Sequence, residues 1–323
     1  MSRKILITGY SGFIGSNLTK KLKDYQINGI GTKKNNSVKN HYYWSSVEEC
    51  QDIDCIVHLA GIAHDTQNTM VEQEYYNINV GLTQKIFQHF LKSFATKFIF
   101  FSSVKAVTDS VEGDQLTEEV LPNPKTPYGK SKFEAEKYIL SELEKWKEEE
   151  MTNGRDIERK KVYILRPCMI HGPGNKGNLN LLYKLQKKGL PWPLGTFENK
   201  QSFCSIDNVL YVVQRLINDN IEEGIYNIAD DESLSTNQLI RLMANSLYKK
   251  AIIWNISPKT IRLIAKIGDI LGLPINSERL KKLTESYIVS NHKLKNALGI
   301  VNMPVTAIDG MKLTIESFKK RDE

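Results

Sequence analysis

Several patterns that mark whole classes of protein are missing from this sequence of 323 residues. It contains no uninterrupted apolar run of about 18 residues, the length that a transmembrane helix needs. The first residues, MSRKILITG, run directly into a strand-like pattern and leave no room for the charged and apolar regions of a signal peptide. The four cysteines form no CxxC pair, as is usual for thiols in a reducing compartment. We therefore expect a cytoplasmic protein without a membrane span.

Features of nucleic-acid-binding proteins are also scarce. The 44 basic and 37 acidic residues leave a formal net charge of +7, but this charge is scattered, with no arginine-rich block and no recognisable nucleic-acid module. A positive balance of this size also suits a cleft that binds pyrophosphate-bearing small molecules. We expect no nucleic-acid partner and no resident metal ion.

Strand-like and helix-like segments alternate in the first half of the chain. Short β-rich or apolar runs predict strands at 4–8, 27–31, 41–44, 54–59, 97–101 and 161–165. Helical periodicity predicts helices at 13–22, 72–91, 128–149, 179–188, 207–218, 235–248, 258–272 and 305–319. This alternation predicts an α/β fold with a Rossmann-type, doubly wound parallel sheet. Residues 1–167, joined by part of 205–230, are expected to form the cofactor-binding domain, and 168–323 mainly a smaller, mixed substrate lobe.

A glycine-rich turn follows the first predicted strand. Gly9, Gly12 and Gly15 have the spacing GxxGxxG, and a helical pattern begins at Phe13 and Ile14. Such glycines allow a tight turn and a close approach of the backbone to a ligand, while the N-terminus of the helix favours a pyrophosphate. We expect these five residues to bind a dinucleotide cofactor.

The segment after the second predicted strand contains no acid between Asp24 and Glu48. NAD-binding units usually carry an Asp or Glu about 20 residues beyond the glycines, where it holds the ribose hydroxyls. Here Thr32 and Lys33, followed by Lys34, lie in that region, and ammonium groups suit a 2′-phosphate. NADP(H) is therefore favoured over NAD(H); the alternative is that backbone groups and Thr32 hold the ribose.

Three residues have the pattern of a proton-transfer site. Tyr128 and Lys132 are four residues apart at the start of a predicted helix, so they share one face. A free phenol has a pKa of about 10, and a close ammonium together with a positive nicotinamide would stabilise its ionised form. Ser103 ends the preceding strand, where its hydroxyl can bond a reacting oxygen. We expect Ser103, Tyr128 and Lys132 to be catalytic.

In this order the motifs resemble the extended short-chain dehydrogenase/reductase family, in its nucleotide-sugar branch of epimerases, dehydratases and ketoreductases. The resemblance covers nearly the whole chain. It rests on GYSGFIG at 9–15, VHLAG at 57–61, NINVGLT at 77–83, FFSSVKAV at 100–107, PYGKSK at 127–132 and LRPCMIHGPG at 165–174. It implies that the cofactor is also contacted by Leu59, Ala60, Gly61, Asn79, Tyr128, Lys132 and Pro167, and that the chain forms a homodimer.

The resemblance also implies residues that bind a UDP-sugar substrate. Asn178 matches an asparagine that contacts the substrate in relatives. The segment 199–209, NKQSFCSIDNV, resembles one that usually reads RSFVYVDDV, but Gln201, beside Lys200, replaces an arginine that relatives use on the nucleotide diphosphate. The predicted substrate-binding residues are Ser103, Lys105, Asn178, Lys200 and Gln201.

The residues after Ser103 distinguish the reactions of the family. Sugar 4,6-dehydratases typically carry an Asp-Glu pair there, whereas this chain has Val104-Lys105. The chain looks most like 4-ketoreductases of UDP-4-keto-6-deoxy-N-acetylhexosamines, enzymes of surface polysaccharide biosynthesis. One alternative is a 4-epimerase of UDP-glucose or UDP-N-acetylglucosamine, which uses the same three residues. Another is a catalytically silent NADP(H)-binding regulatory protein. Because the triad already supplies proton transfer, His171 is interpreted as a residue that shapes a loop.

Overall fold

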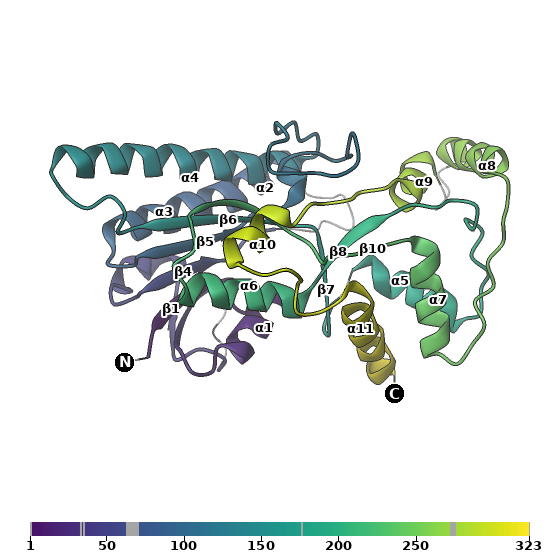
Figure 1. The fold of residues 1–323 in the computed structure, drawn as a ribbon, viewed down its shortest axis with the longest axis horizontal. Coiled ribbons are helices and arrows are strands. Elements are labelled where there is room, and N and C mark those ends of the chain that lie inside the picture. The colour runs from purple at the N-terminus through teal and green to yellow at the C-terminus, as the bar shows by residue number, and fades with distance from the viewer. Residues whose placement is uncertain are drawn as a thin grey trace.

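A large parallel sheet forms the centre of the molecule (Figure 1). The computed structural model describes residues 2–32, 34, 36–62, 71–175, 177–271 and 276–322. The strand order is β3-β2-β1-β4-β5-β6-β9, with every neighbouring pair parallel. The strands are β1 (Lys4–Thr8), β2 (Gln26–Ile30), β3 (Asn40–Tyr42), β4 (Cys55–His58), β5 (Lys97–Phe101), β6 (Lys161–Pro167) and β9 (Gly224–Ile228). The order reverses between β1 and β4, which is where ligands bind in folds of this kind.

Helices cover both faces of this sheet because its strands alternate apolar side chains between the two faces. Ile5 and Ile7 of β1 belong to the core under α1 and α6, whereas Leu6 belongs to the core under α3 and α4. Figure 1 shows these two helical layers below and above the sheet. The helices of this half are α1 (Phe13–Lys21), α2 (Glu72–Tyr75), α3 (Gly81–Lys92), α4 (Pro127–Thr152) and α6 (Ile206–Asn218), with the short turns η1 (Trp44–Glu49), η2 (Tyr76–Val80) and η3 (Val104–Ala106).

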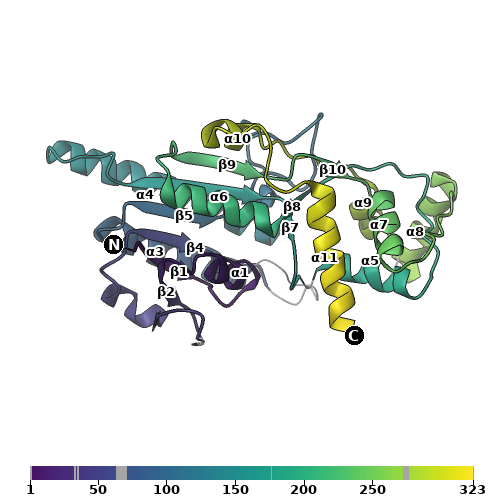
Figure 2. The ribbon, with the colours of Figure 1, turned by 60° about the horizontal axis from the view of Figure 1, so that its bottom comes forward.

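A smaller lobe is built around a three-stranded sheet of order β10-β8-β7. Its strands are β7 (Met169–His171), β8 (Gln201–Ser205) and β10 (Ser233–Leu234). Its helices are α5 (Asn178–Lys187), α7 (Thr236–Ser246), α8 (Pro258–Leu271), α9 (Ser277–Thr284) and α11 (Ala307–Asp322), while α10 (His292–Leu298) packs against β9 of the large sheet. Figure 2 shows the lobe beyond the carboxyl ends of the large sheet's strands.

The structure confirms the predicted α/β class and the six predicted strands, with ends shifted by one or two residues. The helix predicted at 72–91 is interrupted by the π-helical turn η2. The strands β7, β8, β9 and β10 and the helices α9 and α10 were not predicted. These elements are short, and the strands among them pair with segments that lie far away in the chain. Among the described residues, no helix combines the length and the apolar character needed to cross a membrane.

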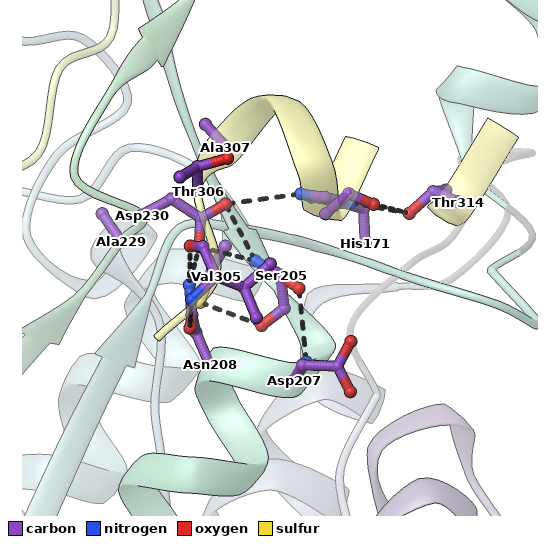
Figure 3. Close-up of polar contacts among 12 residues, drawn as sticks. His171, Ser205, Asp207, Asn208, Ala229, Asp230, Val305, Thr306, Ala307 and Thr314 are labelled. Atoms are coloured by element: carbon purple, nitrogen blue, oxygen red, sulfur yellow. Dashed lines mark hydrogen bonds and ion pairs between the residues drawn. The ribbon is translucent and has the colours of Figure 1, made fainter. Parts of the chain in front are cut away.

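His171 takes part in a buried polar cluster that ties α11 to the two sheets (Figure 3). Its Nδ1 lies 2.8 Å from Oγ1 of Thr314, and its Nε2 lies 3.5 Å from a carboxylate oxygen of Asp230. Asp230 also accepts hydrogen bonds from the Ser205 amide and from the Asn208 side chain. His171 therefore connects β7 with the last helix of the chain, and it lies in a strand rather than in a loop.

Candidate active site

The glycine turn lies at the point where the strand order reverses. Gly9 has a φ of +68°, and a Cβ on it would lie 2.8 Å from the backbone nitrogen of Ala60. A Cβ on Gly15 would lie 2.5 Å from the Gly9 carbonyl oxygen. Side chains are thus excluded at both positions, and the loop after β1 packs directly on the loop after β4.

The N-terminus of α1 suits a pyrophosphate. Its N-cap residue is Gly12, which supplies no side-chain hydrogen bond, and the first helical turn, beginning at Phe13 and Ile14, contains no acid. Backbone N–H groups at such an end carry partial positive charge and attract anions. The shape of the glycine turn and this helix end together fit a dinucleotide, which Gly9, Gly12, Phe13, Ile14 and Gly15 would contact.

A chain of buried hydrogen bonds fixes the loop of Leu59, Ala60 and Gly61. The amides of Leu59 and Ala60 donate to Oγ1 of Thr8, at 3.2 and 3.1 Å. The same oxygen lies 2.6 Å from Nδ1 of His58, whose Nε2 lies 2.9 Å from the hydroxyl of Thr83. Burial holds the pKa of His58 well below its usual value, so the ring is neutral. The loop is therefore held by uncharged groups.

Asn79 joins this loop to the helix that carries Tyr128 and Lys132. Its Oδ1 accepts a 2.7 Å hydrogen bond from the Ile62 amide, and its Nδ2 donates to the Ser131 hydroxyl at 2.9 Å. A Cβ on Gly61 would lie 2.8 Å from Asn79 Oδ1 and 3.3 Å from Lys132 Nζ. Gly61, Asn79 and Lys132 thus meet at one place.

Ser103 lies close enough to Tyr128 for its side chain to act on the pKa of the phenol. Ser103 begins the turn η3, where its Oγ accepts a hydrogen bond from the Lys105 amide at 3.2 Å. Thr126 caps α4 and so places Tyr128 in the first turn of that helix. Burial raises the pKa of Tyr128 to about 12, although the Ser103 side chain acts in the opposite direction. In the protein alone, Tyr128 is therefore a proton donor rather than a phenolate.

Lys132 is buried one turn further along α4. Its Nζ donates a 2.9 Å hydrogen bond to the carbonyl oxygen of Phe101, at the end of β5. Burial lowers the pKa of this ammonium to about 8, and the nearby carboxylate of Glu136 opposes that shift. The lysine therefore titrates close to neutral pH, where a change in its charge is felt by any group bound beside Gly61.

Sequence reasoning missed two features next to these residues. Glu136 accepts hydrogen bonds from Arg166 at 3.0 and 2.6 Å and another from Ser102, and both charged side chains are almost fully buried. The spacing of four residues between Lys132 and Glu136 was a local signal for it. Arg166 gave no such signal, because it reaches α4 from a neighbouring strand.

The second missed feature is Tyr287, between α9 and α10. Its hydroxyl donates to the carbonyl oxygen of Thr108 at 2.8 Å, and its ring lies 4.2 Å below Nζ of Lys105. Its backbone amide donates a hydrogen bond to the carbonyl oxygen of Lys200, and Tyr287 forms an isolated β-bridge with Gln201. Tyr287 therefore connects the turn after Ser103 with β8. Nothing in the local sequence points to this role.

Tyr287 thus brings three of the predicted substrate residues, Lys105, Lys200 and Gln201, into one neighbourhood. The Lys105 ammonium also donates to the carbonyl oxygen of Asp109, and Gln201 Nε2 donates to that of Glu285 at 3.2 Å. Asn178, by contrast, is the first residue of α5, a helix that contacts α7 and α11.

The remaining predicted cofactor residues are Thr32, Lys33 and Pro167. Thr32 is exposed just beyond β2, and Pro167 is buried at the end of β6. Lys33 lies outside the described residues. The described residues contain no group of three or more His, Cys, Asp or Glu side chains arranged to hold a metal ion.

Comparison with known proteins agrees with this geometry. The model of the NAD dependent epimerase/dehydratase family matches residues 5–229. A UDP-glucose 4-epimerase of Vibrio cholerae is 28% identical, over 98% of this chain and 96% of that protein. An N-acetyl-alpha-D-glucosaminyl-diphospho-ditrans,octacis-undecaprenol 4-epimerase of Escherichia coli O157:H7 is 26% identical, over 77% and 74%.

The fold also has solved counterparts. A UDP-glucuronic acid 4-epimerase from Bacillus cereus, solved with NAD, superposes with a TM-score of 0.72 at 20% identity, covering 99% of this chain and all of that one. At this identity the likeness describes the fold alone.

Proposed function

The chain belongs to the NAD-dependent epimerase/dehydratase family, whose members are enzymes, and we propose that it uses NAD(P) to act at C4 of a UDP-sugar. The observation that carries the proposal is a buried Tyr128 close enough to Ser103 for that side chain to act on its pKa, with Lys132 placed beside Gly61. A silent regulatory protein would have no use for a buried proton donor held beside a cofactor loop. The names of the relatives from Vibrio cholerae and Escherichia coli, both sugar 4-epimerases, support C4 as the reacting carbon.

In the proposed reaction, the residues of this chain manage the proton at the C4 oxygen. Tyr128 gives its phenolic proton to that oxygen when a ketone is reduced and takes it back when an alcohol is oxidised. Ser103 donates a hydrogen bond that polarises the same oxygen. Lys132 holds the cofactor ribose and supplies a positive charge near Tyr128. The nicotinamide supplies or accepts the hydride when it is bound.

Two forms of this chemistry are open, and we place the 4-epimerase first. Its support is the relative from Vibrio cholerae, which aligns over nearly the whole chain. The sequence alone favoured a 4-ketoreductase of a UDP-4-keto-6-deoxy-N-acetylhexosamine in surface polysaccharide biosynthesis, and we keep this as the second candidate. It is supported by Lys33 and Lys34, since a net reduction draws on NADPH. A third reaction of the family, dehydration, is disfavoured because Val104-Lys105 supplies no carboxylate.

Two assays separate these candidates. The first supplies UDP-glucose or UDP-N-acetylglucosamine with a catalytic amount of NAD(P) and follows formation of the galacto product. The second supplies UDP-4-keto-6-deoxy-N-acetylglucosamine and follows the oxidation of NADPH and of NADH. Conversion in the first assay supports the epimerase, and stoichiometric oxidation in the second supports the ketoreductase. Activity in neither assay, with Tyr128→Phe as the blank, would remove C4 chemistry on UDP-sugars.

We further propose a preference for NADP(H) over NAD(H), on the missing acid between Asp24 and Glu48 and the two adjacent lysines. We also propose that residues 1–167 with 205–230 act as the cofactor-binding unit and 168–323 mainly as the substrate lobe. A homodimer is proposed through the outer faces of α3 and α4. Light scattering of the purified protein tests the dimer, and the ratio of the dissociation constants for NADPH and NADH tests the cofactor preference.

A further inference from the structure

Helix α8 turns an apolar face toward solvent. On its inner side, Ile261 and Ala265 are buried in the core of the smaller lobe. On its outer side, Leu263, Ile267 and Ile270 are 60%, 45% and 83% exposed. These exposures show that no described part of the chain covers the outer side. The helix therefore has apolar residues on two opposite sides, and the fold accounts for only one of them.

The exposed apolar residues form a continuous stripe. Leu263, Ile267 and Ile270 follow the spacing of four and then three residues that places side chains on one helical face. Ile264 and Leu271, 43% and 65% exposed, widen the stripe along its other edge. Single exposed apolar residues are ordinary, whereas a contiguous exposed stripe marks a surface that binds something.

The charges around this stripe are mainly positive. Lys259, Arg262 and Lys266 are exposed on α8, and the spacing of seven residues between the two lysines places them on the same edge of the stripe. Asp269 is the single acid of the helix. Its carboxylate accepts hydrogen bonds from the amide and the hydroxyl of Ser277, at the N-terminus of α9. The acid is thus engaged within the lobe, while the cations face outward.

The position of α8 leaves the stripe accessible. Figures 1 and 2 both place α8 at the outer end of the smaller lobe, away from the large sheet and from α4. A flat surface that approached this end would meet α8 before it met the glycine turn or Tyr128. Docking at α8 is therefore compatible with an open active site.

We propose that α8 docks the protein on an anionic membrane surface, with the helix lying in the plane of the interface. An exposed apolar stripe bordered by lysine and arginine is the pattern of helices that bury one face at the level of the lipid headgroups. The cations bind the acidic headgroups, and the apolar side chains enter the boundary with the acyl chains. A protein partner would need acidic groups matched to each cation, whereas anionic lipid offers them at any spacing. The inference does not depend on the reaction at C4.

The test is co-sedimentation of the full-length protein with lipid vesicles. Wild type is expected to bind vesicles of equimolar phosphatidylcholine and phosphatidylglycerol. Its binding to vesicles of phosphatidylcholine alone is expected to be weaker by at least about tenfold. The substitutions Leu263→Ser, Ile267→Ser and Ile270→Ser together are expected to weaken binding to the mixed vesicles by at least about tenfold. Lys259→Glu with Lys266→Glu is expected to remove the preference for the anionic lipid.

A matched control carries three serines at apolar positions elsewhere on the surface, namely Phe94→Ser, Leu121→Ser and Val301→Ser, which are 86%, 87% and 83% exposed in the wild type. This variant should bind vesicles like the wild type. Thermal unfolding checks that each variant is folded. Failure of the wild type to bind mixed vesicles overturns the proposal, and so does equal loss in both triple variants. A wild type that ignores vesicles but loses a dimer on substitution of α8 would show instead that the stripe joins two copies of the chain.

Discussion

Glu136 accepts two hydrogen bonds from Arg166, at 3.0 and 2.6 Å, one helical turn beyond Lys132. The pair is almost completely buried, so the two charges compensate each other away from solvent, and the Ser102 hydroxyl donates a further hydrogen bond to the carboxylate. The carboxylate also favours the charged form of Lys132. The buried pair is therefore the electrostatic support of the lysine as well as a contact between α4 and β6.

Glu136→Gln should destabilise the protein strongly. The amide keeps the shape of the side chain but leaves the Arg166 guanidinium buried without a counter-charge, which typically costs about 3–5 kcal/mol of unfolding free energy. Denaturant unfolding of this variant and of Glu144→Gln, an exposed position on the same helix, measures the difference. Equal and small effects in the two variants would show that the pair contributes little.

Gly9→Ala should abolish dinucleotide binding. The new Cβ would lie 2.8 Å from the backbone nitrogen of Ala60, at a φ of +68° that disfavours alanine. Gly154→Ala is the matched control, because Gly154 has a φ of +66° but no heavy atom within 4 Å of such a Cβ. The control should lose only about 1 kcal/mol of stability and bind cofactor normally. Fluorescence titration with NADPH measures cofactor binding by the two variants, and normal binding by Gly9→Ala would contradict the loop's role.

How far the sequence predicted the site follows from the range of each interaction. Gly9, Tyr128 and Lys132 were identified because a turn and a helical spacing of four are local properties that a short motif carries. Arg166 and Tyr287 were missed, since each acts across the fold on residues far away in the chain. The strand β9 was missed for the same reason: it becomes a strand by pairing with β6, from which β7, α5, β8 and α6 separate it in the chain.

Cofactor binding should weaken as pH rises through about 8. Burial lowers the pKa of Lys132 to about 8, so its positive charge is present below that pH and is lost above it. The dissociation constant for NADPH is therefore expected to rise several-fold between pH of about 7 and about 9. Lys132→Met should bind weakly at both values, without this change, and Lys130→Met, at a partly exposed neighbour, should follow the wild type. An equal rise in the Lys132 variant would assign the titration to another group.

Tyr287→Phe should raise KM more than it lowers kcat. The phenylalanine keeps the ring under Lys105 but loses the hydrogen bond to the Thr108 carbonyl oxygen, which positions the turn after Ser103. We expect KM for the UDP-sugar to rise about five- to tenfold, as for the loss of one hydrogen bond of about 1 kcal/mol, with kcat within about twofold of wild type. Steady-state kinetics measures both KM and kcat. A fall in kcat with unchanged KM would show that Tyr287 takes a direct part in the chemistry.

The most direct test of the central claim is transfer of deuterium to C4 of a UDP-sugar. A UDP-4-keto sugar is incubated with NADPH deuterated at its transferable position, and NMR locates the label in the product. We expect deuterium at C4 with the wild type and a rate lower by about 10²–10⁴-fold with Tyr128→Phe, since the variant lacks the proton donor. Deuterium at another carbon, or equal rates with and without the Tyr128 hydroxyl, would contradict it.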